Sequence, residues 1–410
     1  MMQNFDRIQN SKILNTFSLI EDSKKLADKI LFYYSVCLLS FSTILSYSLS
    51  TYAIDFYGYG EFHFFVRQLF AVVIGILLMW LFSQVEPSKL IYKFGFFILF
   101  FSVFLIIIMQ FLPDSFASSA GGAKRWIRLP GFSLAPSEFF KIGFIVFLAW
   151  SFSRKFVGVE RDSVFSELLV LLPYIFVFGF IVFFIAVMQN DLGQVVLMAI
   201  ILGIMLLFAG GSFKLVGILF LTSLALAIVA IITSEHRIIR VKTWWGSIQD
   251  LVLSIFPENL AQSMRIENTP EPYQVFYSIS AMNNGGIFGS GIGDGIIKLG
   301  FLSEVHTDVV LAGLVEEGGI VGLFICLLFF AVILYRILKI ANRTKDNVYS
   351  LFCIGVTIML GFSFLINAFG ITGIIPIKGI AVPFLSYGGS AIIATCIAIG
   401  MVLSISKTIK

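Results

Sequence analysis

The sequence predicts an all-α integral membrane protein, a polytopic bundle of about ten transmembrane helices. Three observations predict this fold: 58% of the 410 residues are hydrophobic, only 13% are charged, and the apolar residues gather in long runs. Ordinary soluble domains carry about 25% charged residues, and a chain of this size has too little interior to bury so much apolar surface. The same composition excludes a disordered chain, a secreted disulfide-rich domain and a nucleic-acid-binding domain.

The four cysteines support this interpretation. They lie inside apolar runs, far apart in the sequence, and form no CxxC pair: Cys37, Cys326, Cys353 and Cys396. We therefore expect buried hydrophobic side chains there rather than a disulfide framework or a metal site.

Ten runs are long and apolar enough to cross a bilayer, which takes about 20 residues. The first run follows a polar segment with no small-residue cleavage site, so we expect a cytoplasmic tail over residues 1–29 and an uncleaved first helix. The runs predict a single transmembrane domain over residues 30–405 and a cytoplasmic tail over 406–410. They cover about residues 30–51, 65–85, 90–112, 136–153, 166–188, 191–210, 213–233, 309–340, 349–370 and 383–405.

The basic residues predict the orientation. When both termini are placed in the cytoplasm, most Lys and Arg outside the runs fall on the cytoplasmic side, as the positive-inside rule requires. Two outer segments then stand out. The loop 113–135 contains Lys124, Arg125 and Arg128 on the translocated side. The segment 234–308 is far longer than an ordinary loop, and its mixed composition predicts re-entrant or interfacial helices.

Two pairs of ionisable residues lie within the predicted spans, where charge is costly and commonly functional. Glu138 and Lys141 share one face of the fourth span at i, i+3 spacing; they form either an ion pair that locks packing or part of a polar cavity that opens outward. Glu316 and Glu317 need a polar partner or water, and the following Gly318-Gly319 suggests a close helix approach or a break.

Three charged residues lie at the outer ends of spans. Asp191 is placed to cap the sixth span, and Arg67 could extend its charge to the membrane interface. Asp308 directly precedes the eighth span, where a carboxylate could cap the helix, act as a general base, or do both.

Other motif patterns fail on spacing or context. The glycines of 289–295 have neither the spacing nor the preceding strand of a dinucleotide-binding loop, so we expect a flexible turn at the membrane surface. The three histidines share no metal-binding spacing, and Ser386 lacks the context of a catalytic nucleophile elbow.

Several segments, read in order, resemble the SEDS family of polytopic cell-wall polymerases (the FtsW, RodA and SpoVE group). The first group is Gly122-Ala123-Lys124-Arg125-Trp126-Ile127, then Pro136-Ser137-Glu138 with Lys141, and Gln189-Asn190-Asp191-Leu192-Gly193. The second is Tyr273-Gln274, Gly285-Gly286-Ile287-Phe288-Gly289, Lys298-Leu299, His306-Thr307-Asp308 and Glu316-Glu317. The third is Asn367, Gly370, Pro376, Lys378-Gly379, Pro383-Phe384 and Ser386-Tyr387-Gly388-Gly389-Ser390.

The resemblance covers the chain from the second predicted helix to the tenth. The C-terminal motif, from Lys378-Gly379 to Ser386, is closer to the FtsW branch than to RodA, which implies a role in cell division. The chain departs from the family pattern at positions that carry no ionisable motif residue: Ala135, Asn190, Val309, Gly318 and Ala391.

The resemblance implies polymerisation of lipid II, an undecaprenyl-pyrophosphate-linked disaccharide peptide, into glycan strands at the outer face of the bacterial cytoplasmic membrane. Asp308 would be the general base or a ligand of a divalent cation (Mg²⁺ or Mn²⁺). Lys124, Arg125 and Lys141 would bind pyrophosphate, Trp126 would anchor the loop, and Glu138 and Asp191 would orient Lys141. The remaining residues expected to bind substrate are His306, Thr307, Lys378 and Ser386.

The resemblance also implies partners, namely a class B penicillin-binding protein that supplies transpeptidation and other membrane proteins of the division machinery. Three alternatives remain at this stage. They are an elongation-type polymerase, a flippase that moves lipid II across the membrane, and a non-catalytic scaffold. Concentration of the polar motifs on the outer half argues against the flippase, and the carboxylates in lipid argue against the scaffold.

Overall fold

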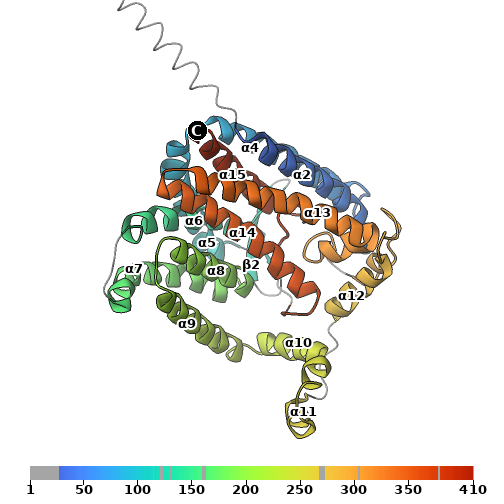
Figure 1. Cartoon of the computed structure of the whole chain (residues 1–410). Coiled ribbons are helices and arrows are strands. Elements are labelled where there is room, and N and C mark those ends of the chain that lie inside the picture. Colours follow the sequence, from blue (N-terminus) through green and yellow to red (C-terminus); the bar gives the residue numbers. More distant parts are fainter. Residues whose placement is uncertain are drawn as a thin grey trace, which may run out of the picture.

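The structure, a computed structural model, describes residues 27–113, 115–120, 123–129, 132–158, 163–266, 273–302, 305–376 and 379–409. Figure 1 shows a bundle of helices that lie side by side, with the C-terminal helix inside it. The predicted all-α membrane fold is confirmed. Lys378, expected to bind substrate, lies outside the described residues.

A helix stands at each of the ten predicted runs. They are α2 (Lys29–Leu49), α4 (His63–Gln84), η1 with α5 (Lys89–Phe94 and Gly95–Phe111), α6 (Pro136–Lys155), α7 with η2 (Val164–Phe183 and Phe184–Met188), α8 (Leu192–Phe208), α9 (Phe213–Ile232), α13 (Val310–Arg343), α14 (Asn347–Ile371) and α15 (Gly389–Ser406). A short helix, α3 (Thr51–Tyr57), follows α2. Among the described residues, seven helices are long and apolar enough to cross a membrane: α2, α4, η1 with α5, α9, α13, α14 and α15. That α6, α7 and α8 also cross stays a prediction, as does the side on which the termini lie.

The last predicted span is wrong at its start. The apolar run begins at residue 383, but α15 begins at Gly389. Residues 383–388 form a turn that is buried between helices, which explains why its composition is apolar although its backbone is not helical.

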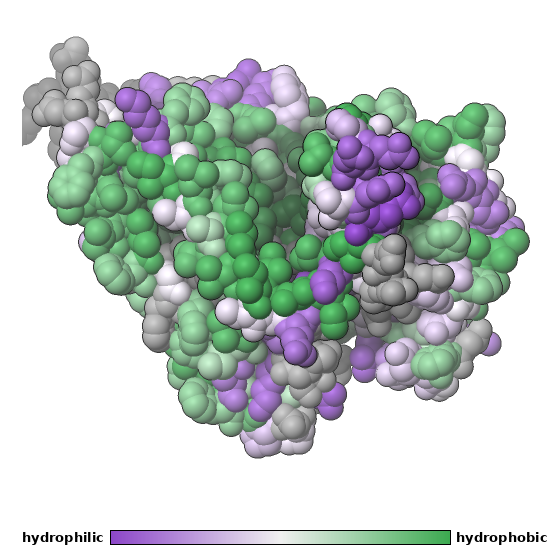
Figure 2. Space-filling view, turned by 90° about the horizontal axis from the view of Figure 1, so that it is seen from below, coloured by the Kyte–Doolittle hydropathy of each residue, from purple (hydrophilic) through white to green (hydrophobic). Residues whose placement is uncertain are grey.

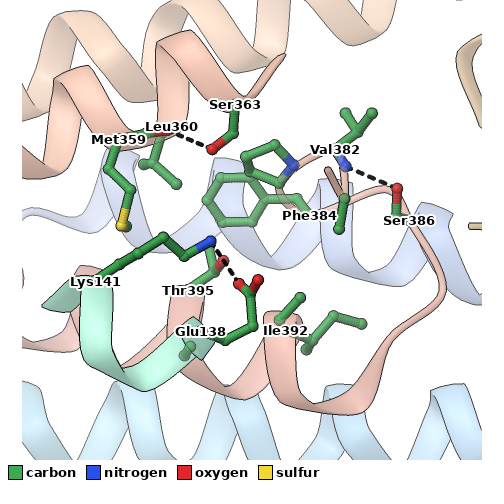
Figure 3. A pocket seen from close by; sticks show the side chains of 14 residues that line it. Glu138, Lys141, Met359, Leu360, Ser363, Val382, Phe384, Ser386, Ile392 and Thr395 are labelled. Carbon is green, nitrogen blue, oxygen red and sulfur yellow. Dashed lines mark hydrogen bonds and ion pairs between the residues drawn. The ribbon is translucent and has the colours of Figure 1, made fainter. Parts of the chain in front are cut away.

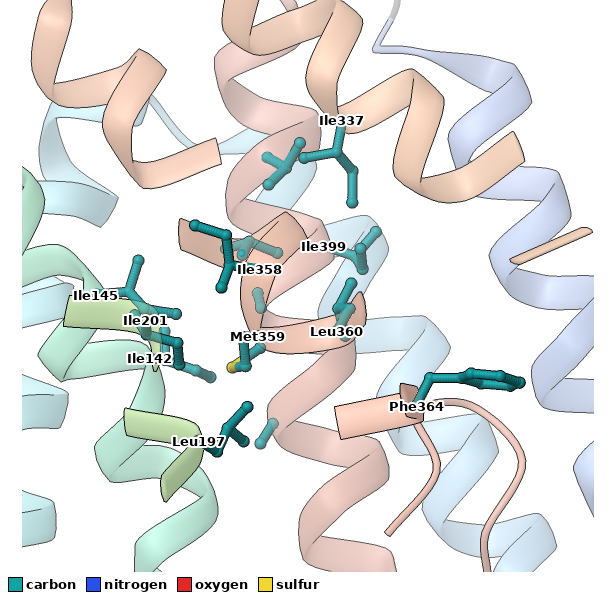
Figure 4. Packing of buried hydrophobic residues seen from close by; sticks show 14 of the residues in the cluster. Ile142, Ile145, Leu197, Ile201, Ile337, Ile358, Met359, Leu360, Phe364 and Ile399 are labelled. Carbon is teal, nitrogen blue, oxygen red and sulfur yellow. The ribbon is translucent and has the colours of Figure 1, made fainter. Parts of the chain in front are cut away.

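Helices α14 and α15 form the centre of the bundle. Most of the residues in both are buried, and Figure 4 shows isoleucines of α6, α8, α14 and α15 that pack together there. Gly143 allows the closest approach at this level, because a Cβ atom at Gly143 would lie 2.6 Å from the Cα atom of Leu99 on α5.

The outer faces of the helices are apolar rather than polar. In α9 only Leu215 is buried, and large side chains such as Phe220 and Leu226 are exposed. Figure 2 shows a face on which green hydrophobic residues form a broad surface and purple hydrophilic residues gather in separate clusters. Such a surface is stable only in lipid, which agrees with the predicted membrane location.

The outer loop 113–135 contains a small antiparallel sheet that the sequence did not predict. Its strands are β1 (Ala117–Ala120), β2 (Ala123–Leu129) and β3 (Phe132–Leu134), in that order. Buried Ala117 and Ile127 pack on Met109 at the end of α5. The strands carry small and charged residues rather than a clear alternation of apolar and polar ones, so period-2 analysis could not detect them.

The described parts of segment 234–308 include helices, as predicted; that these helices are re-entrant or interfacial stays a prediction. The segment contains α10 (Glu235–Leu253), α11 (Glu258–Met264), α12 (Tyr273–Gly285) and the 3₁₀ turn η3 (Ile297–Leu299). The glycines of 289–295 were expected to form a flexible surface turn; residues 292–294 are exposed, so the surface turn is confirmed, and its flexibility stays a prediction. The turn also packs against α13, because the backbone N–H groups of Ser290 and Gly291 donate to the carbonyl oxygens of Glu316 and Glu317.

The predicted break in α13 is confirmed. Gly319 adopts φ 66° and ψ −171°, which interrupts the helical geometry between Val310 and Arg343. A positive φ of this kind is readily adopted only by glycine.

Candidate active site

Asp308 lies in the turn that leads into α13. Its carboxylate lies against the backbone of Gly379, because a Cβ atom built at Gly379 would be 2.9 Å from Asp308 Oδ2. Helix α13 begins at Val310 with Val309 at its N-cap. The expectation that Asp308 caps this helix is therefore wrong by one residue, and the partly buried Asp308 stands outside the cap.

The segment 379–388 holds the turn around Asp308 in place. Ser386 Oγ donates to the carbonyl oxygen of Thr307 at 2.7 Å and accepts from the backbone N–H of Val382 at 2.8 Å. The backbone N–H of Tyr387 donates to the carbonyl oxygen of His306 at 2.7 Å. Ser386 is buried and its hydroxyl fixes the backbone beside Asp308; binding of substrate by Ser386 stays a prediction.

Asn367 of α14 links the turn around Asp308 to segment 379–388. Its side-chain N–H₂ donates to the carbonyl oxygens of Asp308 at 2.6 Å and Ile380 at 2.9 Å. The backbone on both sides of Asp308 is thus hydrogen-bonded to buried side chains, which limits the positions that its carboxylate can adopt.

His306 lies in an aromatic cluster. Its ring centroid is 4.7 Å from that of Phe64 and 5.3 Å from that of Tyr387, and the side chain is buried. Burial raises the pKa of the Tyr387 hydroxyl in this outer turn, and the charge and hydrogen bond of Arg67 on α4 partly oppose that rise. Arg67 therefore contacts the site through Tyr387 rather than only reaching toward the interface.

Glu138 and Lys141 form the ion pair that their spacing predicted. Lys141 Nζ lies 2.8 Å from Glu138 Oε2, and both side chains are largely buried. Figure 3 shows them beside a small cavity, with Thr395 of α15 and Ser386 also at its walls. The cavity has about 20 Å³ of free space, room for one water molecule. The pair is joined to α8, because Gln194 donates to Glu138, and it also lines this cavity; that the cavity opens outward stays a prediction.

Asp191 is the N-cap of α8, in the connection after η2. Its Oδ1 atom accepts from the backbone N–H of Gln194 at 3.2 Å, and Gln194 Nε2 donates to Glu138 Oε1 at 3.1 Å. Burial raises the pKa of the Asp191 carboxyl, and Arg125 partly opposes that rise. Asp191 thus reaches the Glu138–Lys141 pair through Gln194.

The basic loop is tied to the same connection. Arg125 on β2 donates to the carbonyl oxygens of Gln189 at 2.8 Å and Asn190 at 2.9 Å. Lys124 donates to the carbonyl oxygen of Leu112, and Trp126 is half-buried on the same strand. These contacts give Lys124 and Arg125 structural roles; binding of pyrophosphate by either residue stays a prediction.

Segment 379–388 lies between the cavity beside Lys141 and the turn around Asp308, and contacts both. Ser386 and Val382 line the cavity beside Lys141 and also form the hydrogen bonds that fix Thr307. The structure therefore brings Glu138, Lys141 and Ser386 together at the cavity, and Asp308 lies against Gly379 of the same segment 379–388. Lys124 and Arg125 are connected to the cavity through the 189–191 backbone.

Asp308 and a substrate diphosphate together could hold a divalent cation here. Within the described ranges, no group of three or more His, Cys, Asp or Glu side chains is arranged to hold a metal ion. Mg²⁺ commonly binds one or two carboxylates together with substrate phosphate oxygens, so Asp308 and a diphosphate together fit its requirements.

Sequence reasoning gave Asn367 and Lys298 only as parts of family motifs and missed Gln68. Gln68 of α4 is fully buried; its Nε2 donates to the Ser386 carbonyl oxygen, and its Oε1 accepts from the Gly388 backbone. A single amide inside an apolar span is the signal that could have identified Asn367 and Gln68, because a buried amide requires partners.

Comparison with known proteins identifies the family of this chain. The family model for FtsW, RodA and SpoVE, described as "Cell cycle protein", matches residues 28–410. The chain belongs to this family. It is similar to a Helicobacter pylori protein named "Probable peptidoglycan glycosyltransferase FtsW", with 53% identity over 93% of this chain and 99% of that protein. A Bacillus subtilis protein of the same name is 31% identical over 96% of this chain and 93% of its own length.

Solved structures of the FtsW, RodA and SpoVE family share the fold. A chain from a structure described as "Structural coordination of polymerization and crosslinking by a peptidoglycan synthase complex" matches with a TM-score of 0.65 and 22% identity, over 93% of this chain and 98% of that one. Thermus thermophilus RodA, a rod shape determining protein, matches with a TM-score of 0.59 and 20% identity, over 93% of this chain and 96% of that one. The chain is a SEDS-type, multi-pass protein of the bacterial inner membrane, and its curated relatives place it nearer to FtsW than to RodA.

Proposed function

We propose that this protein is a peptidoglycan glycosyltransferase that polymerises lipid II at the outer face of the membrane during septal wall synthesis. The observation that carries the proposal is the partly buried Asp308, whose backbone is fixed on both sides by Ser386 and Asn367. The proteins named FtsW that align along almost the whole chain are named for this activity.

The reaction replaces the pyrophosphate at C1 of one sugar with the 4-hydroxyl of another. A sugar hydroxyl is a poor nucleophile at neutral pH, so a positioned carboxylate base contributes about 10²–10⁴-fold. Asp308 accepts the proton of the acceptor hydroxyl while the C–O bond forms, and the diphosphate leaves with its electron pair. An ordered backbone around the base keeps it within hydrogen-bonding distance of that hydroxyl.

Positive charge near the departing diphosphate stabilises the transition state. Lys141 is a buried cation at the cavity wall formed by segment 379–388, and Glu138 fixes its direction. Lys124 and Arg125 would contact the outer part of the diphosphate. A bound Mg²⁺ or Mn²⁺, held by Asp308 and the diphosphate, would supply further charge neutralisation. His306, Thr307, Lys378 and Ser386 would complete the substrate-binding surface or support it.

A class B penicillin-binding protein is the partner we propose, together with other membrane proteins of the division machinery. The support is the fold similarity to a chain in a structure described as a peptidoglycan synthase complex that coordinates polymerization and crosslinking.

Lipid II flipping is the main competing function, because intramembrane Glu138 and Lys141 would suit a transporter as well. Polymerisation in detergent separates the two, since a detergent micelle offers no bilayer to cross. The purified full chain, with fluorescent lipid II and with or without the transpeptidase, should yield glycan strands. Absence of polymer in both cases, with transfer of lipid II across vesicle membranes, would instead establish a flippase.

A further inference from the structure

The break in α13 is filled by the glycine-rich loop that follows α12. On one side of the break, the carbonyl oxygens of Glu316 and Glu317 accept from the backbone N–H groups of Ser290 and Gly291 at 2.9 and 3.0 Å. On the other side, the N–H group of Ile320 donates to the carbonyl oxygen of Gly286 at 3.1 Å. The loop thus supplies the hydrogen bonds that the interrupted helix lacks, as backbone in a membrane requires.

The contact between the loop and the helix leaves no space for side chains. A Cβ atom at Gly285 would lie 1.9 Å from the carbonyl oxygen of Val315, and one at Gly289 would lie 2.1 Å from that of Glu317. Glycine at these positions is therefore a packing requirement rather than a sign of flexibility.

Two buried charged residues join this contact to a third element. Lys298 of η3 forms an ion pair with Glu317 Oε1, and each side chain is only 1% exposed. Ser48 of α2 donates from its hydroxyl to the same Oε1 atom at 2.5 Å, and Lys298 Nζ donates to the Ser48 carbonyl oxygen at 3.1 Å. The pair therefore connects α2, the outer segment and α13.

Glu316, the residue before Glu317, binds α12 and η3 through its side chain. Its Oε1 atom accepts from Asn284 Nδ2 at 3.1 Å and from the Ile297 backbone at 2.7 Å, and its Oε2 atom accepts from the Lys298 backbone at 3.3 Å. Both carboxylates that the sequence analysis singled out are thus bound to the outer segment rather than directed into a cavity.

The half-helix Val310–Gly318 is short, and the break separates it from the long remainder of α13. Its position therefore depends on contacts with other elements, which include the close packing of Gly313 on Leu49 and the contacts around Glu316 and Glu317. Asp308 lies two residues before its first residue. A shift of this half-helix moves the Asp308 carboxylate with it.

We propose that Lys298 and Glu317 are positioning residues for polymerisation: their buried ion pair fixes the half-helix Val310–Gly318 and thereby the location of Asp308. This inference rests on the proposed function. A buried ion pair is not needed for stability alone, because apolar residues of similar size often serve as well or better. The pair instead restricts geometry, since the hydrogen bond from Lys298 to Glu317 forms only when the two side chains keep one relative position.

The test compares single and double variants of the full chain in detergent. Lys298→Met and Glu317→Gln each leave a buried group without its partner. The double variant Lys298→Met/Glu317→Leu removes both charges and so restores an apolar contact. Arg336→Met is the matched control, because Arg336, 28 residues from Asp308 in the sequence, also lies on α13 but pairs with Asp28 at the N-cap of α2. Melting temperature, kcat, KM for lipid II and the pH profile of kcat are measured for each.

We expect the single variants to lose at least about tenfold in kcat with KM for lipid II within about twofold. The double variant should recover the melting temperature but not kcat, and its pH profile should be displaced. Lys298→Arg, which keeps the charge, should recover part of kcat. Arg336→Met should lower the melting temperature without changing the pH profile.

Recovery of both melting temperature and kcat in the double variant would overturn the inference, because the pair would then be structural only. Asp308→Asn in the same assay keeps this result separate from the proposed function. Full polymerisation by Asp308→Asn would contradict the function itself, whereas an inactive Asp308→Asn beside a fully active double variant would contradict only the positioning role.

Discussion

Ser386 and Thr307 are 79 residues apart in the sequence, and the Ser386 hydroxyl donates to the Thr307 carbonyl oxygen at 2.7 Å. The same hydroxyl accepts from the Val382 backbone, and its side chain lines the cavity beside Lys141. One buried serine thus connects the ion-pair cavity to the backbone of Asp308.

Ser386→Ala should weaken this connection. The Val382 N–H group would lose its buried acceptor, which costs about 1–3 kcal/mol, and the polymerisation rate should fall more than lipid II affinity does. Ser102→Ala is the control, because the buried Ser102 hydroxyl donates to the Leu99 carbonyl oxygen of its own helix and does not line the cavity. Initial rates and melting temperatures of both variants check this; equal rates for the two would contradict the bracing role of Ser386.

Lys141→Met should be among the most destabilising single changes in the chain. It leaves the largely buried Glu138 carboxylate without its cation, and breaking a buried pair in this way costs about 3–5 kcal/mol. The double variant Glu138→Gln/Lys141→Met should lose less than the sum of the two single losses. A thermal-melting cycle measures this difference, and strict additivity would show that the two side chains do not interact.

Lys124→Glu with Arg125→Glu should weaken lipid II binding, since two positive charges near the diphosphate become negative. Arg125→Gln separates charge from structure, because glutamine can still donate to one carbonyl of the 189–190 backbone. Arg128→Gln, at an exposed position of the same strand, is the control. Binding of fluorescent lipid II is the measurement; unchanged affinity in the charge-reversed double variant would exclude contact with the diphosphate.

The pH dependence of stability should report on Asp191. Its pKa is raised from the ordinary value of 3.8, so the folded state favours the protonated form. As pH rises from about 4 through the raised pKa, ionisation should destabilise the native protein relative to Asp191→Asn. Asparagine keeps the capping acceptor for Gln194, so the variant's melting curve should lack this dependence. If the melting temperatures of the two proteins changed with pH in the same way between pH 4 and 8, the pKa of Asp191 would not be raised in the folded state.

The positions of the ten helices could be predicted because lipid imposes a length and an apolar composition on each span. The ends could not, and residues 383–388 show why. Their apolar side chains are buried by neighbouring helices rather than by lipid, so composition extended the last span past its true start at Gly389. The small sheet over 117–134 was missed for a related reason, since its strands lack an apolar alternation.

In the site, the sequence could predict only contacts between residues that lie close together in the chain. Glu138 and Lys141 are three residues apart on one helix, so their contact follows from helix geometry. Lys298 and Glu317 are separated by a loop and a helix break, and Ser386 reaches Thr307 from another segment. Such contacts depend on how the chain returns on itself, which single-residue patterns do not record.

The rate of glycan polymerisation by Asp308→Asn, relative to the unaltered protein, tests the central claim most directly. Asparagine has nearly the same shape and keeps the backbone contact to Asn367, so a melting temperature close to that of the unaltered protein verifies the fold. With purified lipid II in detergent, the account predicts a loss of at least about 100-fold. Polymer formed at the unaltered rate would contradict it.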